Sequence, residues 1–222
     1  MPIDFDWGRI LLRAPGLLVG ITIHEFFHAW TAWKLGDDTP LEQGRVTLNP
    51  LAHLDFLGTI LIIFGPFGWG KPVQINRHNF RNPGRDDILV SAFGPLSNLA
   101  VAIGFAGLLS IFAHIRPWGT VPPAIGIAAC LAVQINVVLM FFNLIPLAPL
   151  DGSHILRALL PYQQQEAFDA FSNYAPFILL GIVFCFSKLL SGPIDFLTRL
   201  VLAPFGLSDY LQYLNRAIPG MI

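Results

Sequence analysis

Long apolar runs separated by short polar segments dominate the sequence. The first run extends from about Ala14 to Trp33, and further runs cover about 88–115, 124–144 and 175–190. Because an α-helix rises about 1.5 Å per residue, about 20 apolar residues are enough to cross the roughly 30 Å hydrocarbon core of a bilayer. Each of these runs is therefore predicted to form a membrane-spanning helix.

The region between the first two runs, 37–85, has a different pattern. It is polar and rich in turn-forming residues, except for the apolar stretch 56–68. That stretch would cover only about 20 Å as a helix, so we expect it to re-enter the membrane or lie on its surface rather than cross it. The alternation of apolar and polar residues over 72–76 predicts a short strand. We therefore expect a small re-entrant or β-hairpin element over 37–85.

The third run ends in a segment that proline breaks. Prolines at 146 and 149 stop the helix just before Asp151-Gly152, and a short helix is expected over about 153–160. The tail of the chain is amphipathic. Its 193–207 part is predicted either to lie at the membrane interface or to make a short final span.

Composition supports a membrane protein. The chain is 54% hydrophobic and 12% charged, whereas a soluble domain carries roughly 25% charged residues. We expect an all-α polytopic membrane protein with a core of three transmembrane helices and about one to three further membrane helices. It should form one domain over 1–222, with a core over about 14–160 and C-terminal helices over about 161–222. The net charge of −1 gives no reason to expect a nucleic acid partner.

The strongest chemical signal is His24-Glu25-Phe26-Phe27-His28, inside the first apolar run. Histidines four residues apart lie on one face of a helix and can hold one metal ion, and the intervening glutamate can act on a water at that metal. Ionisable groups at membrane depth are costly and are functional by default. The motif therefore predicts metal-dependent hydrolysis inside a membrane.

Three further residues complete the predicted site. A catalytic zinc usually has three protein ligands, and Asp151 is the best third candidate because it follows a broken segment at membrane depth. Glu25 is then the expected general base for the water that attacks a peptide carbonyl. Asn143 is expected to hydrogen-bond an extended substrate backbone or the oxyanion.

Other roles for these side chains remain open. Asp151 could cap the helix that follows it, and Asn143 could make a hydrogen bond between membrane helices. His154 could donate to the Asp151 carboxylate, or it could be a histidine on a helix face without such a role.

The basic residues predict the orientation in the membrane. The loop 69–87 carries four of them, and Lys34 and Arg45 join that side if 56–68 does not cross. The excess of Lys and Arg places this side in the cytoplasm. The two histidines, six to ten residues before Lys34, and Asp151, at the end of the third helix, then fall near the same cytoplasmic face.

Paired motifs resemble those of the site-2 protease family of intramembrane zinc metalloproteases. That family combines H-E-x-x-H with a downstream N-x-x-P-x-x-P-x-D-G signature, which is present here in full from Asn143 to Gly152. The segment GPLSN at 94–98 resembles the family's G-P-x-x-N, with Asn98 expected to be structural. The segment GRVTLNP at 44–50 resembles a loop and sheet region of small prokaryotic members. The resemblance covers roughly 14–160.

The resemblance implies that His24, His28 and Asp151 bind one zinc ion per chain. It implies that Glu25 is the catalytic acid and base and that Asn143 helps to position substrate. The substrates would be transmembrane segments of other proteins, locally unwound and cut within or near the bilayer. The short connection between the second and third helices and the short tail indicate a minimal prokaryotic member without PDZ or regulatory nucleotide-binding domains.

Two other classes of protein fit parts of the pattern. A non-proteolytic membrane metalloprotein could use two histidines and a carboxylate for iron, although Glu25 would then have no role. A transporter could use broken helices with ionisable residues at depth, although the sequence has no inverted repeat. In each case we expect a multi-pass protein of a lipid bilayer, and the protease reading places it in a prokaryotic cell (inner) membrane.

Overall fold

The structure, a computed structural model, describes residues 7–64, 68–115, 123–185 and 187–207. In these ranges the named elements are all helices. The long helices are α1 (Trp7–Lys34), α4 (Pro83–Ile115) and α5 (Pro123–Asn143). The shorter helices are α2 (Thr39–Glu42), α3 (Phe56–Phe64), α6 (Asp151–Leu159), α7 (Tyr162–Ser172), α8 (Ala175–Cys185) and α9 (Ser187–Leu202). Single 3₁₀ turns lie at η1 (Pro50–Ala52), η2 (Arg77–Asn79) and η4 (Ala203–Phe205).

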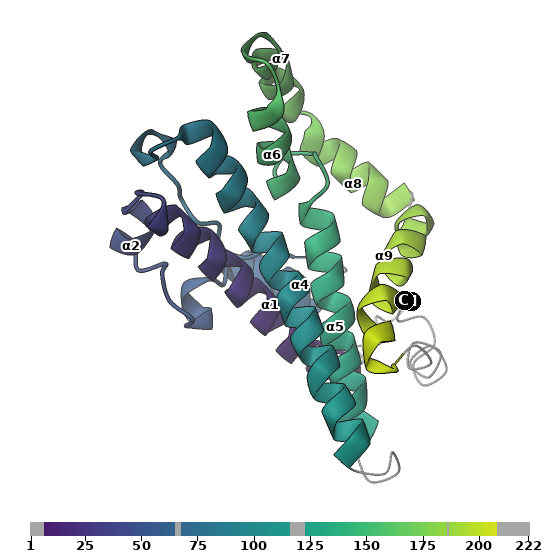
Figure 1. The fold of residues 1–222 in the computed structure, drawn as a ribbon. Helices are drawn as coiled ribbons and strands as arrows, with labels where there is room; N and C mark the ends of the chain where they lie inside the picture. The colour runs from purple at the N-terminus through teal and green to yellow at the C-terminus, as the bar shows by residue number, and fades with distance from the viewer. Residues whose placement is uncertain (1–6, 65–67, 116–122, 186, 208–222) are drawn as a thin grey trace.

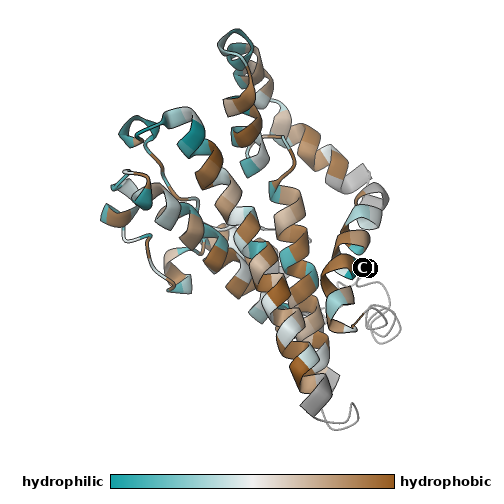
Figure 2. Ribbon diagram, viewed as in Figure 1, coloured by the Kyte–Doolittle hydropathy of each residue, from teal (hydrophilic) through white to brown (hydrophobic). Residues whose placement is uncertain are grey.

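Three helices in the described part of the chain are long and apolar enough to cross a membrane. These are Ile10–Lys34, Pro83–Phe112 and Ala124–Asn143. The helices α1, α4 and α5 pack against one another and form the centre of the molecule (Figure 1). Apolar colours predominate along them, whereas polar residues gather at α2, at the start of α4 and at α7 (Figure 2). The predicted three-helix core is confirmed.

Two of these helices begin earlier than predicted, and α4 has a clear reason. Pro83 occupies its first position, where the missing N–H of proline leaves no hydrogen bond unmade. The carboxylate of Asp86 accepts a hydrogen bond from the backbone N–H of Asn82, at 2.9 Å. This contact ties the first turn to the residue before the helix, so the helix starts before the apolar run begins.

Small residues let α1 and α5 approach closely. A Cβ atom at Gly16 would lie 2.5 Å from Cα of Ala132, and one at Gly20 would lie 2.7 Å from Oδ1 of Asn136. Both glycines lie one turn apart on the same face of α1, as in other closely packed membrane helices. The pair fixes the H-E-x-x-H helix against α5.

The 37–85 region lies beside α1 and contains a short helix. At nine residues, α3 covers about 14 Å and cannot span a bilayer. The predicted β-hairpin is not confirmed, because the described residues contain only an isolated antiparallel bridge between Leu54 and Gly70. Gly58 in α3 lets the segment around Trp69 pass close to this helix, since a Cβ atom at position 58 would lie 2.1 Å from the carbonyl oxygen of Trp69.

The C-terminal part corrects one prediction. The run 175–190 falls in two described helices on either side of residue 186, α8 up to Cys185 and α9 from Ser187, and the two take different directions (Figure 1). At eleven residues, α8 covers about 16 Å, which is too short to span a bilayer alone. The helix α9 packs on α5 and α4. The predicted turn over 116–122 and the tail beyond 207 lie outside the described residues.

Candidate metal centre

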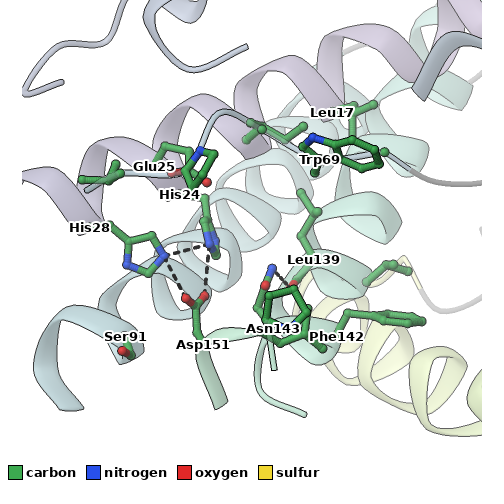
Figure 3. A pocket seen from close by; sticks show the side chains of 18 of the residues that line it. Leu17, His24, Glu25, His28, Trp69, Ser91, Leu139, Phe142, Asn143 and Asp151 are labelled. Atoms are coloured by element: carbon green, nitrogen blue, oxygen red, sulfur yellow. Dashed lines mark hydrogen bonds and ion pairs between the residues drawn. The ribbon is translucent and has the colours of Figure 1, made fainter. Parts of the chain in front are cut away.

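Three of the predicted site residues meet at one point (Figure 3). His24 and His28 lie one turn apart on α1 with their Nε2 atoms 2.9 Å apart. The carboxylate of Asp151, at the start of α6, approaches both rings, with Oδ2 3.2 Å from Nε2 of His24 and Oδ1 3.3 Å from Nε2 of His28. One ligand atom from each residue lies within 4.8 Å of the others, close enough to hold a metal ion.

The partners of the histidines determine which nitrogen faces Asp151 with a lone pair. Nδ1 of His24 lies 2.7 Å from Oδ1 of Asn98, and Nδ1 of His28 lies 2.8 Å from the carbonyl oxygen of Val90. Both partners are acceptors, so each neutral ring carries its hydrogen on Nδ1 and presents the lone pair of Nε2. Two imidazole lone pairs and a carboxylate that face one another fit a cation, and this donor set suits catalytic zinc.

The amide of Asn98 has its own fixed orientation. Its Nδ2 donates to the carbonyl oxygen of Gly20 and to Oδ1 of Asn136, both at 3.0 Å. Asn136 in turn donates to the carbonyl oxygen of Gly16 at 3.2 Å. Asn98 and Asn136 are both fully buried. Asn98 is therefore held by groups from α1 and α5, and it orients the ring of His24. The structural role expected for Asn98 thus consists of holding one of the candidate ligands.

Two glycines make room for the centre. A Cβ atom at Gly94 on α4 would lie 2.3 Å from Nε2 of His28 and 2.9 Å from Cε1 of His24. A Cβ atom at Gly152 would lie 2.4 Å from the carbonyl oxygen of Leu144. The first glycine leaves space for both rings, and the second lets the broken segment fold back toward α1.

Asp151 is the first residue of α6 rather than its cap. The N-cap position belongs to Leu150, and the helix has no side-chain capping bond. The capping role is therefore not what orients this carboxylate.

A cavity of about 1470 Å³ borders the centre. Glu25 and Asn143 line it, together with apolar side chains from α5, α8 and α9 such as Leu139, Leu179 and Ile194. Nδ2 of Asn143 donates to the carbonyl oxygen of Leu139 at 2.9 Å, within its own helix. The cavity thus carries a carboxylate and an amide beside the candidate metal ligands, and its wall is otherwise largely apolar.

The ring of His154 has a partner other than Asp151. Its Nδ1 lies 2.6 Å from Nη2 of Arg77, whose Nε donates to Asp87 at 3.0 Å. Burial and the charge of Arg77 lower the pKa of His154. Since Nδ1 accepts this hydrogen bond, His154 is a neutral ring held by η2 and α4, and it also lines the cavity.

Comparisons with known proteins point to one family. The model of Peptidase family M50 matches residues 123–186. A Bacillus subtilis (strain 168) protein named "Putative zinc metalloprotease YwhC" is 41% identical over 170 residues, which cover 76% of this chain and 77% of that protein. A Mycolicibacterium smegmatis protein named "Putative zinc metalloprotease Rip2" is 32% identical over 169 residues, covering 72% of this chain and 61% of that protein. No solved structure was found to match the chain.

Proposed function

Because the chain belongs to peptidase family M50, the site-2 protease family, and is a multi-pass membrane zinc metalloprotease, we propose that it hydrolyses peptide bonds within or near transmembrane segments of other membrane proteins. The position of the H-E-x-x-H motif carries this proposal. Glu25 and both histidines lie inside the candidate span Ile10–Lys34 and line the cavity. Family membership does not support the non-proteolytic metalloprotein or the transporter.

His24, His28 and Asp151 hold one zinc ion per chain in this proposal. A zinc ion in such a site polarises the scissile carbonyl and acidifies water. Glu25 takes a proton from the attacking water and passes it to the nitrogen of the leaving amine. The hydrogen bonds to Asn98 and Val90 keep both imidazoles in the orientation that ligation needs.

The substrate is bound in an extended conformation beside α1. An intact helix keeps its carbonyls in internal hydrogen bonds, so the scissile carbonyl of a helical substrate would not be free to approach the metal centre. The lining of the cavity includes Arg13 and His28, which are separated by about 22 Å along a helix. An extended chain of six or seven residues has about this length. The partly exposed amide of Asn143 hydrogen-bonds the unwound backbone.

The proposal also covers location and organisation. In this proposal the protein lies in the inner membrane of a prokaryotic cell with its active site near the cytoplasmic face, and the basic residues between α1 and α4 support this orientation. One domain spans 1–222, with the catalytic core over about 14–160. The later helices add the outer wall of the cavity, since Leu179 and Ile194 line it.

Co-expression with a library of single-span membrane proteins tests the function. Wild type should shorten a subset of these proteins, and Glu25→Gln should leave them intact because an amide cannot accept the proton. Glu42→Gln is the matched control, since Glu42 is an exposed glutamate on α2. Cleavage by Glu25→Gln at the wild-type rate would remove Glu25 as the base, and no cleavage of any member by wild type would contradict the proposed substrate class.

A further inference from the structure

One buried arginine lies behind the proposed general base. Nη2 of Arg45 is 3.8 Å from Oε2 of Glu25, and the arginine side chain is 5% exposed. Arg45 does not line the cavity, so it can influence a bound substrate only through another residue. We propose that Arg45 is a positioning residue that fixes the Glu25 carboxylate at the metal centre. This inference rests on the proposed function.

The guanidinium is anchored by two separate chain segments. Nη1 donates to the carbonyl oxygen of Ala52 in η1, and Nη2 donates to the carbonyl oxygen of Lys71. The two segments also bind each other, since the N–H of Lys71 donates to the carbonyl oxygen of His53 at 2.7 Å. A planar guanidinium can serve several acceptors in a fixed geometry, which a lysine ammonium cannot do in the same way. The guanidinium of Arg45 therefore has a fixed position and can hold a neighbouring carboxylate in one orientation.

The charges explain why Glu25 is its partner. A buried charge is costly unless an opposite charge compensates for it. Both carbonyl partners of Arg45 are neutral, and Glu25 supplies the opposite charge. Burial lowers the pKa of Arg45, and the Glu25 carboxylate raises it. The ion pair holds one oxygen of a side chain that otherwise has three rotatable bonds.

The other carboxylate oxygen is bordered by backbone. A Cβ atom at Gly70 would lie 3.5 Å from Oε1 of Glu25 and 2.8 Å from Cγ2 of Ile21. Gly70 thus allows the chain that Arg45 anchors through Lys71 to pass close to the carboxylate. Glu25 is confined between a guanidinium and this segment, which restricts its orientation toward the cavity.

Kinetics of Arg45→Gln in the full-length protein, purified in detergent with zinc bound, test the role. The probe is fluorescein-labelled casein, an unfolded chain. We expect kcat to fall on the order of 100-fold, the cost of a misplaced catalytic group, while KM and zinc content stay within about twofold of wild type. Arg45→Lys, which keeps the charge, should recover about tenfold of that loss. The matched control Arg85→Gln removes an exposed arginine and should behave as wild type.

The same substitution made in a Glu25→Asp variant distinguishes a positioning role of Arg45 from a purely structural one. Glu25→Asp retracts the carboxylate from Arg45, so adding Arg45→Gln should then cost no more than about threefold. An equal loss in both backgrounds, a loss matched by falling zinc content, or wild-type kcat in Arg45→Gln would overturn the inference. If Arg45→Gln does not fold, Arg45→Lys is compared in the same two backgrounds against the same criterion. Full activity in Glu25→Gln would remove Glu25 as the base in the proposed function, and the role of Arg45 would fail with it, whereas wild-type kcat in Arg45→Gln with an inactive Glu25→Gln would leave the proposed function standing.

Discussion

Both candidate histidine ligands have one ring nitrogen occupied by an acceptor. Asn98 holds Nδ1 of His24, and the Val90 carbonyl holds Nδ1 of His28. The remaining nitrogens converge on Asp151 at 3.2 and 3.3 Å. At the scale of single residues, the site therefore depends as much on the groups behind the ligands as on the ligands themselves.

Gly94→Ala should weaken metal binding. The added methyl would lie 2.3 Å from Nε2 of His28, so the rings or α4 must move. We expect lower zinc content after dialysis against a chelator, with the helical circular dichroism unchanged. Gly104→Ala in the same helix is the control, because its Cβ atom would meet nothing within 4 Å. Equal zinc retention in the two variants would show that Gly94 makes no space for the ligands.

Asn98→Ala should lower zinc affinity by about 10- to 100-fold, the usual cost of losing a group that orients a ligand. The change removes the acceptor for Nδ1 of His24, and it removes the N–H donor to Oδ1 of Asn136. Competition with a zinc indicator measures the affinity. Asn79→Ala removes a partly buried hydrogen bond to Asp37 that involves none of the candidate ligands, and should leave the affinity unchanged. Unaltered affinity in Asn98→Ala would contradict the orienting role.

The residues that sequence reasoning missed share a physical cause. The spacing of His24 and His28 places them on one helix face, and the prolines before Asp151 indicate a break, so these ligands could be predicted. Arg45 and Gly94 act through contacts between distant segments, which periodicity does not encode. Their signal was the surrounding motifs, GRVTLNP and GPLSN, whose roles a resemblance alone does not assign.

At the scale of elements, close helix packing positions the site. Gly16 and Gly20 bring α1 against α5, and α4 packs on both. The long apolar runs predicted these helices because length and hydropathy are local properties. The split of 175–190 into α8 and α9 could not be predicted in this way, because a run of apolar residues does not show where a helix changes direction. The polar stretch 162–172 likewise forms α7 without a strong apolar pattern.

Gly16→Ala should destabilise the protein. Its Cβ atom would lie 2.5 Å from the backbone of Ala132, and overpacking of this kind costs about 1–3 kcal/mol. The measurement is the thermal unfolding midpoint in detergent, which should fall. Gly181→Ala in α8 is the control, since its Cβ atom would meet nothing within 4 Å. A midpoint equal to that of the control would mean that α1 and α5 separate without cost.

At the scale of the whole molecule, the three candidate spans pack together and all three line the cavity. The polar region 68–83 lies at the same end as the candidate metal centre, since Asn76 and Arg77 line the cavity together with Asp151. Composition predicted the three spans, and the basic residues predict the orientation, because both report on the solvent around each segment. The detailed structure of the 37–85 region could not be predicted from the sequence, since its contacts are mostly between loops.

Cysteine labelling tests the orientation. In a background without Cys130 and Cys185, an impermeant thiol reagent applied to intact cells should label Ala124→Cys and not His78→Cys. Both positions are exposed, and Ala124 lies in the first turn of α5 at the end opposite the centre. Labelling of His78→Cys and not of Ala124→Cys would show the opposite orientation in the membrane, with the active site near the outer face.

The central claim is that this chain cuts peptide bonds at membrane depth with the His24–Glu25–His28–Asp151 constellation. Mass spectrometry of the products formed from one single-span substrate in proteoliposomes tests it most directly. We expect a single cut inside the transmembrane segment or within a few residues of its cytoplasmic end, absent with Glu25→Gln or a zinc chelator and restored by zinc. Cuts confined to a soluble tail, or the same products from Glu25→Gln, would contradict it.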